Sequence, residues 1–85
     1  MKLFSYIITD EIGIHARPAG LLVKEAKGFS SKITIDANGK TADATKLIAL
    51  MQLGAKKGTE IVVKAEGKDE DAAIIQMEVF MKDNL

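Results

Sequence analysis

Hydrophobic residues alternate with polar residues in some stretches of the chain and recur at helical spacing in others, and this contrast predicts the secondary structure. Alternation and a high density of β-branched and aromatic residues predict strands over residues 2–9, 32–37, 40–43 and 59–65. Apolar residues at helical spacing predict helices over residues 16–27 and 46–53, and from the acidic stretch 67–71 onward. The predicted order is therefore strand, helix, strand, strand, helix, strand, helix.

Short signals at the ends of these elements refine the prediction. Asn38-Gly39 predicts a tight hairpin, because both residues accept a positive φ. Gly28 and Gly54 are suited to close the first two helices in the left-handed conformation. Thr45 is a suitable N-cap for the second helix.

The second predicted helix is apolar around most of its circumference. A helix of two turns that packs on one sheet cannot bury every side, so we expect Leu50 and Leu53 in the core. Some of the remaining apolar residues should then be exposed: Leu47, Ile48 and Met51. The alternative is a tight fold that buries them all. An exposed group would form a protein-docking patch, and its rim would be basic: Lys24, Lys27, Lys46 and Lys56.

The simplest arrangement of these elements is one four-stranded sheet with three helices on a single face, an α/β open-faced sandwich. Each helix then buries one apolar side against the sheet. In the last helix Met77 and Met81 recur with Ala73 at helical spacing, which indicates core residues and not metal or cofactor ligands. The strand order does not follow from this pattern.

Length and composition restrict the class of protein. A chain of 85 residues predicts a single domain spanning 1–85. Cysteine is absent, which excludes disulfides and thiolate metal sites and favours the cytoplasm. The apolar run near the N-terminus is short and interrupted by Ser5, so we expect neither a signal peptide nor membrane insertion. Zero formal net charge argues against nucleic acid as a partner, and we expect a monomer.

Charge is distributed unevenly along the chain. Residues 14–57 contain eight basic and three acidic residues, whereas the remainder contains four basic and nine acidic residues. One hypothesis is that the basic half meets acidic partner proteins. The alternative is ordinary surface charge.

Candidate chemistry is concentrated in the segment Gly13–Ala19, which contains the only His, the only Arg and the only Pro of the chain. The predicted helix begins near Ala16, so His15 lies at its N-terminal edge. Pro18 fits the first turn, where an amide has no intrahelical acceptor. The free amides there form a site for an anion, and the guanidinium of Arg17 is well shaped to bind phosphoryl oxygens.

The positive end of the helix also favours the neutral, nucleophilic form of the His15 imidazole. This segment could therefore accept a phosphoryl group. The alternative is that His15 is a helix cap or an ordinary surface residue. The chain offers no Ser-His-Asp set, nucleotide-binding glycine loop or metal cluster, so carrying a group suits it better than turnover of a small molecule.

The segment Gly13-Ile14-His15-Ala16-Arg17-Pro18-Ala19 resembles the active-site signature of the histidine-containing phosphocarrier (HPr) family of the bacterial phosphoenolpyruvate:sugar phosphotransferase system. Residues 53–61 (LGAKKGTEI) and 38–40 (NGK) are also similar to that family, so the resemblance covers essentially the whole chain. It implies an antiparallel sheet with strand order 1-4-2-3.

The resemblance also implies roles for particular residues. Enzyme I would phosphorylate His15 on Nδ1, and His15 would pass the group to the EIIA domain of a sugar permease system. Arg17 would neutralise the phosphoryl oxygens, and the amides of Ala16 and Arg17 would bind them. Further residues match the partner-docking surface of the family: Ala16, Gly20, Leu21, Lys24, Lys27, Leu47, Ile48, Met51 and Gln52. No metal or organic cofactor is expected, and the protein would be a carrier and not an enzyme.

One position departs from the family pattern. Lys46 stands where the family commonly has a serine that HPr kinase/phosphorylase modifies, so regulation at this position is not expected. Its charge near a helix N-terminus is locally unfavourable.

Two other functions fit the residues. A paralogous carrier could serve a regulatory, nitrogen-related phosphorelay. A docking module that is never phosphorylated could bind partners through Leu47, Ile48 and Met51, with His15 as a mere cap.

Overall fold

The computed structural model describes residues 1–85 and contains the predicted elements in the predicted order. The strands are β1 (Lys2–Ile7), β2 (Lys32–Ala37), β3 (Lys40–Asp43) and β4 (Glu60–Glu66). The helices are α1 (Ala16–Ala26), α2 (Leu47–Met51) and α3 (Glu70–Asn84). The observed α2 is shorter than predicted at both ends. No helix has the length and apolar character that crossing a membrane requires.

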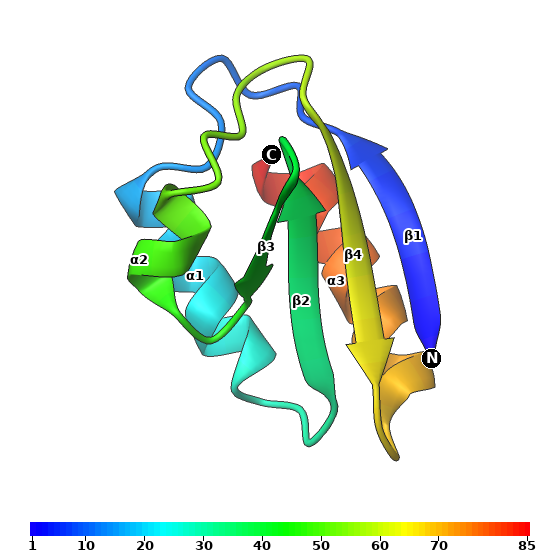
Figure 1. Ribbon diagram of the computed structural model, residues 1–85. Helices are drawn as coiled ribbons and strands as arrows, with labels where there is room; N and C mark the ends of the chain where they lie inside the picture. The colour runs from blue at the N-terminus through cyan, green and yellow to red at the C-terminus, as the bar shows by residue number, and fades with distance from the viewer.

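The strands form one antiparallel sheet in the order β1-β4-β2-β3. Val63 of β4 is paired with Phe4 of β1 on one side and with Ile35 of β2 on the other. All three helices lie on the same face of this sheet (Figure 1). The predicted open-faced sandwich and the strand order implied by the family resemblance are both confirmed.

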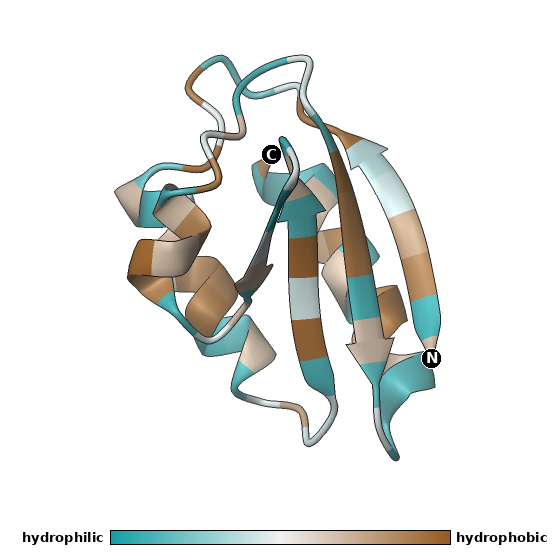
Figure 2. Ribbon diagram, in the orientation of Figure 1, coloured by the Kyte–Doolittle hydropathy of each residue, from teal (hydrophilic) through white to brown (hydrophobic).

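The core lies between the sheet and the helices. Alternate residues of β2 and β4 point into it, so the hydropathy colours alternate along β2 (Figure 2). Ile35, Val63, Met77 and Met81 are fully buried. The two methionines are therefore core residues, as their spacing predicted.

The turn predictions are mostly confirmed. Asn38 and Gly39 have φ values of 53° and 75°, and Gly54 has a φ of 66°. The prediction for Gly28 was wrong, because its φ is not positive. The chain instead leaves α1 through a tight turn, in which the amide of Gly28 donates to the Glu25 carbonyl at 3.1 Å and that of Phe29 to the Ala26 carbonyl at 3.2 Å.

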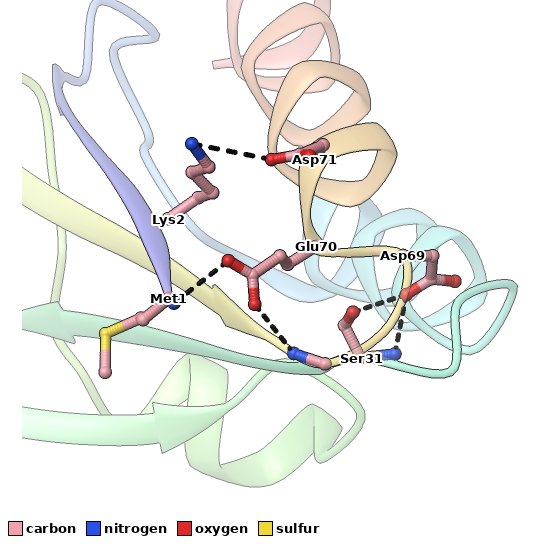
Figure 3. Close-up of polar contacts among 7 residues, drawn as sticks. Met1, Lys2, Ser31, Asp69, Glu70 and Asp71 are labelled. Carbon is pink, nitrogen blue, oxygen red and sulfur yellow. Dashed lines mark hydrogen bonds and ion pairs between the residues drawn. The ribbon is translucent and has the colours of Figure 1, made fainter.

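A polar cluster joins three segments at the start of α3 (Figure 3). The Asp69 carboxylate accepts hydrogen bonds from the amides of Ser30 and Ser31 at 2.9 and 2.8 Å, and from the Ser31 hydroxyl. The Glu70 carboxylate accepts the amide of Gly67 at 3.1 Å and contacts the α-amino group of Met1 at 2.9 Å. These contacts tie the α1–β2 connection and the start of β1 to α3.

Candidate functional site

His15 lies immediately before α1, in the position that the sequence predicted. Its backbone is extended (φ −118°, ψ −173°), and its side chain makes no capping hydrogen bond to the helix. His15 is also half-exposed. His15 is thus the N-cap residue by its backbone, whereas its imidazole takes no part in capping.

The first turn of α1 leaves two backbone amides beside His15 without an intrahelical acceptor. The first helical hydrogen bond runs from the Ala19 amide to the His15 carbonyl at 2.9 Å, so the amides of Ala16 and Arg17 precede it. Pro18, the third helical residue, has no amide hydrogen to leave unpaired. The two amide donors and the positive end of the helix thus come directly after His15, and together they favour binding of an anion there.

His15 and Arg17 share a shallow hollow at one end of the molecule. Leu21 lines it from the next turn of α1, and three further polar residues line it from other segments: Asp10, Asp83 and Asn84. A hollow of this kind is too open and too polar to enclose a small substrate, but it leaves the imidazole accessible to another protein.

The backbone of the α2–β4 connection supports this end of the molecule. The amide of Ile14 donates to the Ala55 carbonyl at 2.9 Å, and Ile14 itself is buried. Gly13 has a φ of 81° and packs so closely on this connection that a Cβ there would lie 2.2 Å from the Ala55 oxygen. The two loops lie side by side in Figure 1. Only glycine fits at position 13.

The two acidic residues of the hollow were not predicted from the sequence. Asp83 comes from the opposite end of the chain, and no local pattern could place it beside His15. Asp10 carries a signal that was overlooked, because an Asp shortly before a Gly often closes a turn with its side chain. Its carboxylate accepts the amides of Ile12 and Gly13 at 3.1 and 3.0 Å.

Two helices present the residues that match the docking surface of the family. α1 and α2 pack against each other, and every one of these residues is exposed: Ala16, Gly20, Leu21, Lys24, Lys27, Leu47, Ile48, Met51 and Gln52. The prediction that α2 divides its apolar residues is confirmed, since Leu50 and Leu53 are buried whereas Leu47, Ile48 and Met51 are 39%, 64% and 39% exposed.

The β2–β3 hairpin holds the C-terminal end of α2. The Asn38 side-chain amide donates to the carbonyls of Leu53 and Gly54 at 2.9 and 3.2 Å, and the Lys40 ammonium donates to the Gln52 carbonyl at 3.1 Å. These carbonyls follow the last helical residue of α2, where the chain offers no further helical amide, so the hairpin supplies their donors. The position of the exposed apolar residues of α2 thus depends on a turn that is distant in sequence.

The start of α2 differs from the prediction. Lys46, not Thr45, is the N-cap residue, and no side chain caps the helix. The Thr45 hydroxyl instead donates to the Asp43 carboxylate at 2.6 Å, and the Thr45 amide donates to it at 2.9 Å. These bonds are the main cause of the lowered pKa of Asp43, and the nearby charge of Lys46 lowers it further. Asp43 therefore offsets the positive charge of Lys46 at the helix N-terminus.

Comparison with known proteins shows what the chain as a whole is similar to. The family described as PTS HPr component phosphorylation site matches residues 3–83. The phosphocarrier protein HPr of Mycoplasma capricolum is 48% identical over 83 residues, which cover 98% of this chain and 93% of that protein.

Solved structures give the same result. A histidine-containing phosphocarrier protein from Mycoplasma matches with a TM-score of 0.93 and 48% identity, over 96% of this chain and 93% of that one. An HPr from Thermoanaerobacter tengcongensis matches with a TM-score of 0.91 and 35% identity, over 98% and 93% of the two chains.

Proposed function

This chain belongs to the HPr family of phosphocarrier proteins of the phosphotransferase system, and we propose that His15 is the residue that carries its phosphoryl group. The observation that carries this proposal is the placement of an accessible imidazole, with no capping role, directly before the free amides of Ala16 and Arg17. The family assignment favours the sugar phosphotransferase carrier over a regulatory paralogue and over a docking module.

The proposed transfer needs no base and no metal ion. The lone pair of Nδ1 attacks phosphorus, and the N–P bond forms while the bond between phosphorus and the donor protein breaks. The electron pair of the broken bond stays with the donor, and the other ring nitrogen of His15 keeps its proton. The guanidinium of Arg17 and the two amides then stabilise the phosphoryl oxygens with charge-assisted hydrogen bonds. The reverse steps deliver the group to an acceptor.

The donor we propose is Enzyme I, and the acceptors are EIIA domains of sugar permease systems. Both would dock on the exposed faces of α1 and α2, with apolar side chains at the centre and lysines around them. Such a surface suits a partner with an apolar patch rimmed by acidic residues. The carrier would turn over no small molecule by itself, and it would act in the cytoplasm.

Two further features of the proposal concern regulation and assembly. Position 46 is a lysine, so we propose that this carrier is not controlled by phosphorylation of a serine at that position. We also propose a monomer, because the transfer site and the docking faces lie within one chain. An HPr of Thermoanaerobacter tengcongensis has been solved as a dimer, and the molar mass of this chain in solution distinguishes the two states.

Intact-mass analysis tests the central proposal. Incubation with Enzyme I, magnesium and phosphoenolpyruvate should add one phosphoryl group that acid removes. His15→Ala should abolish the adduct completely, because the chain has no other histidine.

As a control, circular dichroism should show that His15→Ala folds like wild type. A half-exposed His15 without hydrogen bonds from its side chain to the helix contributes little to stability. If wild-type protein stays unmodified while Enzyme I is demonstrably phosphorylated, the proposal is wrong.

A further inference from the structure

The loop that leads from β1 to His15 is folded around one carboxylate. Asp10 Oδ2 accepts the amides of both Ile12 and Gly13, at 3.1 and 3.0 Å. The amide of Asp10 itself donates to the Leu85 carbonyl at 2.8 Å, which fixes the carboxylate relative to the end of α3. Because Gly13 is buried, its amide would lose its only acceptor without this carboxylate.

The same loop is held at its other end by the α2–β4 connection. Ile14 is buried and its amide is bonded to the Ala55 carbonyl at 2.9 Å. Residues 10–14 are therefore fixed at both ends, and His15 is the next residue. Since the His15 side chain makes no capping bond of its own, the backbone of this loop determines where the imidazole lies.

Asp10 also contributes charge to the hollow. It lines the hollow together with His15, Arg17 and Asp83, so two acidic residues and one arginine share the hollow with His15. A phosphoryl group on His15 would bring about two negative charges into this space. Arg17 stabilises those charges, whereas the carboxylates of Asp10 and Asp83 repel them.

We propose that Asp10 is a positioning residue of the phosphotransfer site. Its carboxylate shapes the loop that presents His15, and its charge, with that of Asp83, opposes the phosphorylated state and so favours release of the group to an acceptor. This inference rests on the proposed function, in that it takes His15 as the phosphoryl acceptor. It assigns Asp10 no contact with the reacting atoms.

Three variants separate the two effects. Asp10→Asn keeps a side-chain oxygen that accepts the two amides but removes the charge, whereas Asp10→Ala removes both. Asp83→Asn removes a charge from the same hollow, and Asp83 holds no amide of the loop. The measurements are the rate of phosphorylation by Enzyme I, the half-life of the isolated phosphoprotein, and amide hydrogen exchange at Ile12 and Gly13.

Positioning predicts that Asp10→Ala slows phosphorylation by about tenfold or more, because a small misplacement of a reacting group is costly. Amide exchange at Gly13 should accelerate in the same variant, and Asp10→Asn should restore both properties. Charge predicts that Asp10→Asn and Asp83→Asn each lengthen the half-life of the phosphoprotein by about two- to fivefold, as expected for partly exposed charges. A purely structural role would not produce this change.

The positioning role is overturned if Asp10→Ala is phosphorylated at the wild-type rate with unchanged exchange at Gly13. The charge effect is overturned if neither Asn variant changes the half-life. Should Asp10→Ala fail to fold, Asp10→Gln replaces it, because the acceptor is then displaced by one methylene group. If wild-type protein accepts no phosphoryl group, the proposed function fails, and the exchange at Ile12 and Gly13 still decides whether Asp10 holds the loop.

Discussion

Gly13 and Gly39 have similar positive φ values in different surroundings. Their φ values are 81° and 75°, in the region that L side chains rarely adopt. A Cβ on Gly39 would meet nothing within 4 Å, whereas a Cβ on Gly13 would lie 2.2 Å from the Ala55 oxygen and 2.6 Å from Lys56 Cα. Both neighbours of Gly13 are backbone atoms, so they cannot move aside without displacing the loop.

We therefore expect the two Gly→Ala variants to differ in stability. Gly39→Ala should lower the free energy of unfolding by about 1–2 kcal/mol, the cost of the left-handed conformation alone. Gly13→Ala should lower it by about 3 kcal/mol or more, because steric overlap is added. Urea denaturation measures both values. Equal losses in the two variants would contradict the close approach of Gly13 to Ala55.

At the scale of elements, α3 is joined to the α1–β2 connection by the carboxylate of Asp69. Its hydrogen bonds from Ser31 and Ser30 lower the pKa of Asp69 below its usual value of 3.8, and the Ser31 hydroxyl is the largest cause. A lowered pKa means that the unfolded chain binds this proton more readily than the folded chain. The contribution to stability is therefore complete above about pH 4 and is lost as the pH falls through the lower, folded-state pKa.

We expect Asp69→Asn to destabilise the protein at pH 7 and to match wild type more closely as the pH falls below the usual Asp pKa. The asparagine presents one oxygen where the carboxylate presents two, so part of the hydrogen bonding to Ser30 and Ser31 is lost. Thermal unfolding between pH 2 and pH 7 provides the comparison.

Asp71→Asn is the matched control on the same helix. Asp71 is 79% exposed and contacts only Lys2, at 3.6 Å. An exposed pair of this kind and a carboxylate in the first turn of a helix each contribute about 1 kcal/mol or less, so this variant should stay close to wild type at every pH. If the difference in stability between Asp69→Asn and wild type did not change with pH, the charge of the Asp69 carboxylate would be unimportant.

At the scale of the whole molecule, exposed apolar residues occur on α1 and α2, on α3, on β1 and in the loop before His15, and two of these surfaces offer a matched pair of isoleucines. Ile48 belongs to the face of α1 and α2 beside His15, and Ile75 belongs to α3; each is 64% exposed. Lys24, Lys27 and Lys46 are exposed near the first surface. The first surface includes α1, which begins directly after His15, so we expect it, and not the surface around Ile75, to contact phosphotransfer partners.

We expect Ile48→Ser to lower kcat/KM for phosphorylation by Enzyme I by about tenfold or more, since burying an isoleucine contributes about 1.5–3 kcal/mol. Ile75→Ser, with equal exposure in the free protein, should leave kcat/KM unchanged. Steady-state phosphorylation assays compare the two variants, and urea denaturation checks that both remain folded. Equal effects would argue against docking through α2.

The sequence by itself determined the elements, their order, the buried sides and the hairpin at Asn38-Gly39. It also predicted that Leu50 and Leu53 are buried while some of Leu47, Ile48 and Met51 are exposed. These properties depend on residues within a few positions of one another, where periodicity and backbone preference operate directly. The segment around His15 could be identified in the same way, because its chemistry is contiguous.

Only the tertiary structure decided what depends on distant partners. Asp83 reaches the hollow of His15 because the end of α3 lies beside the β1–α1 loop, and Gly13 must be glycine because Ala55 packs against it. Thr45 leaves α2 uncapped because Asp43, held at the end of β3, binds its hydroxyl and amide. In each case packing brings together groups whose hydrogen bonds or steric overlap outweigh the local preference. The outcome depends on residues that are distant in sequence, so the local sequence cannot predict it.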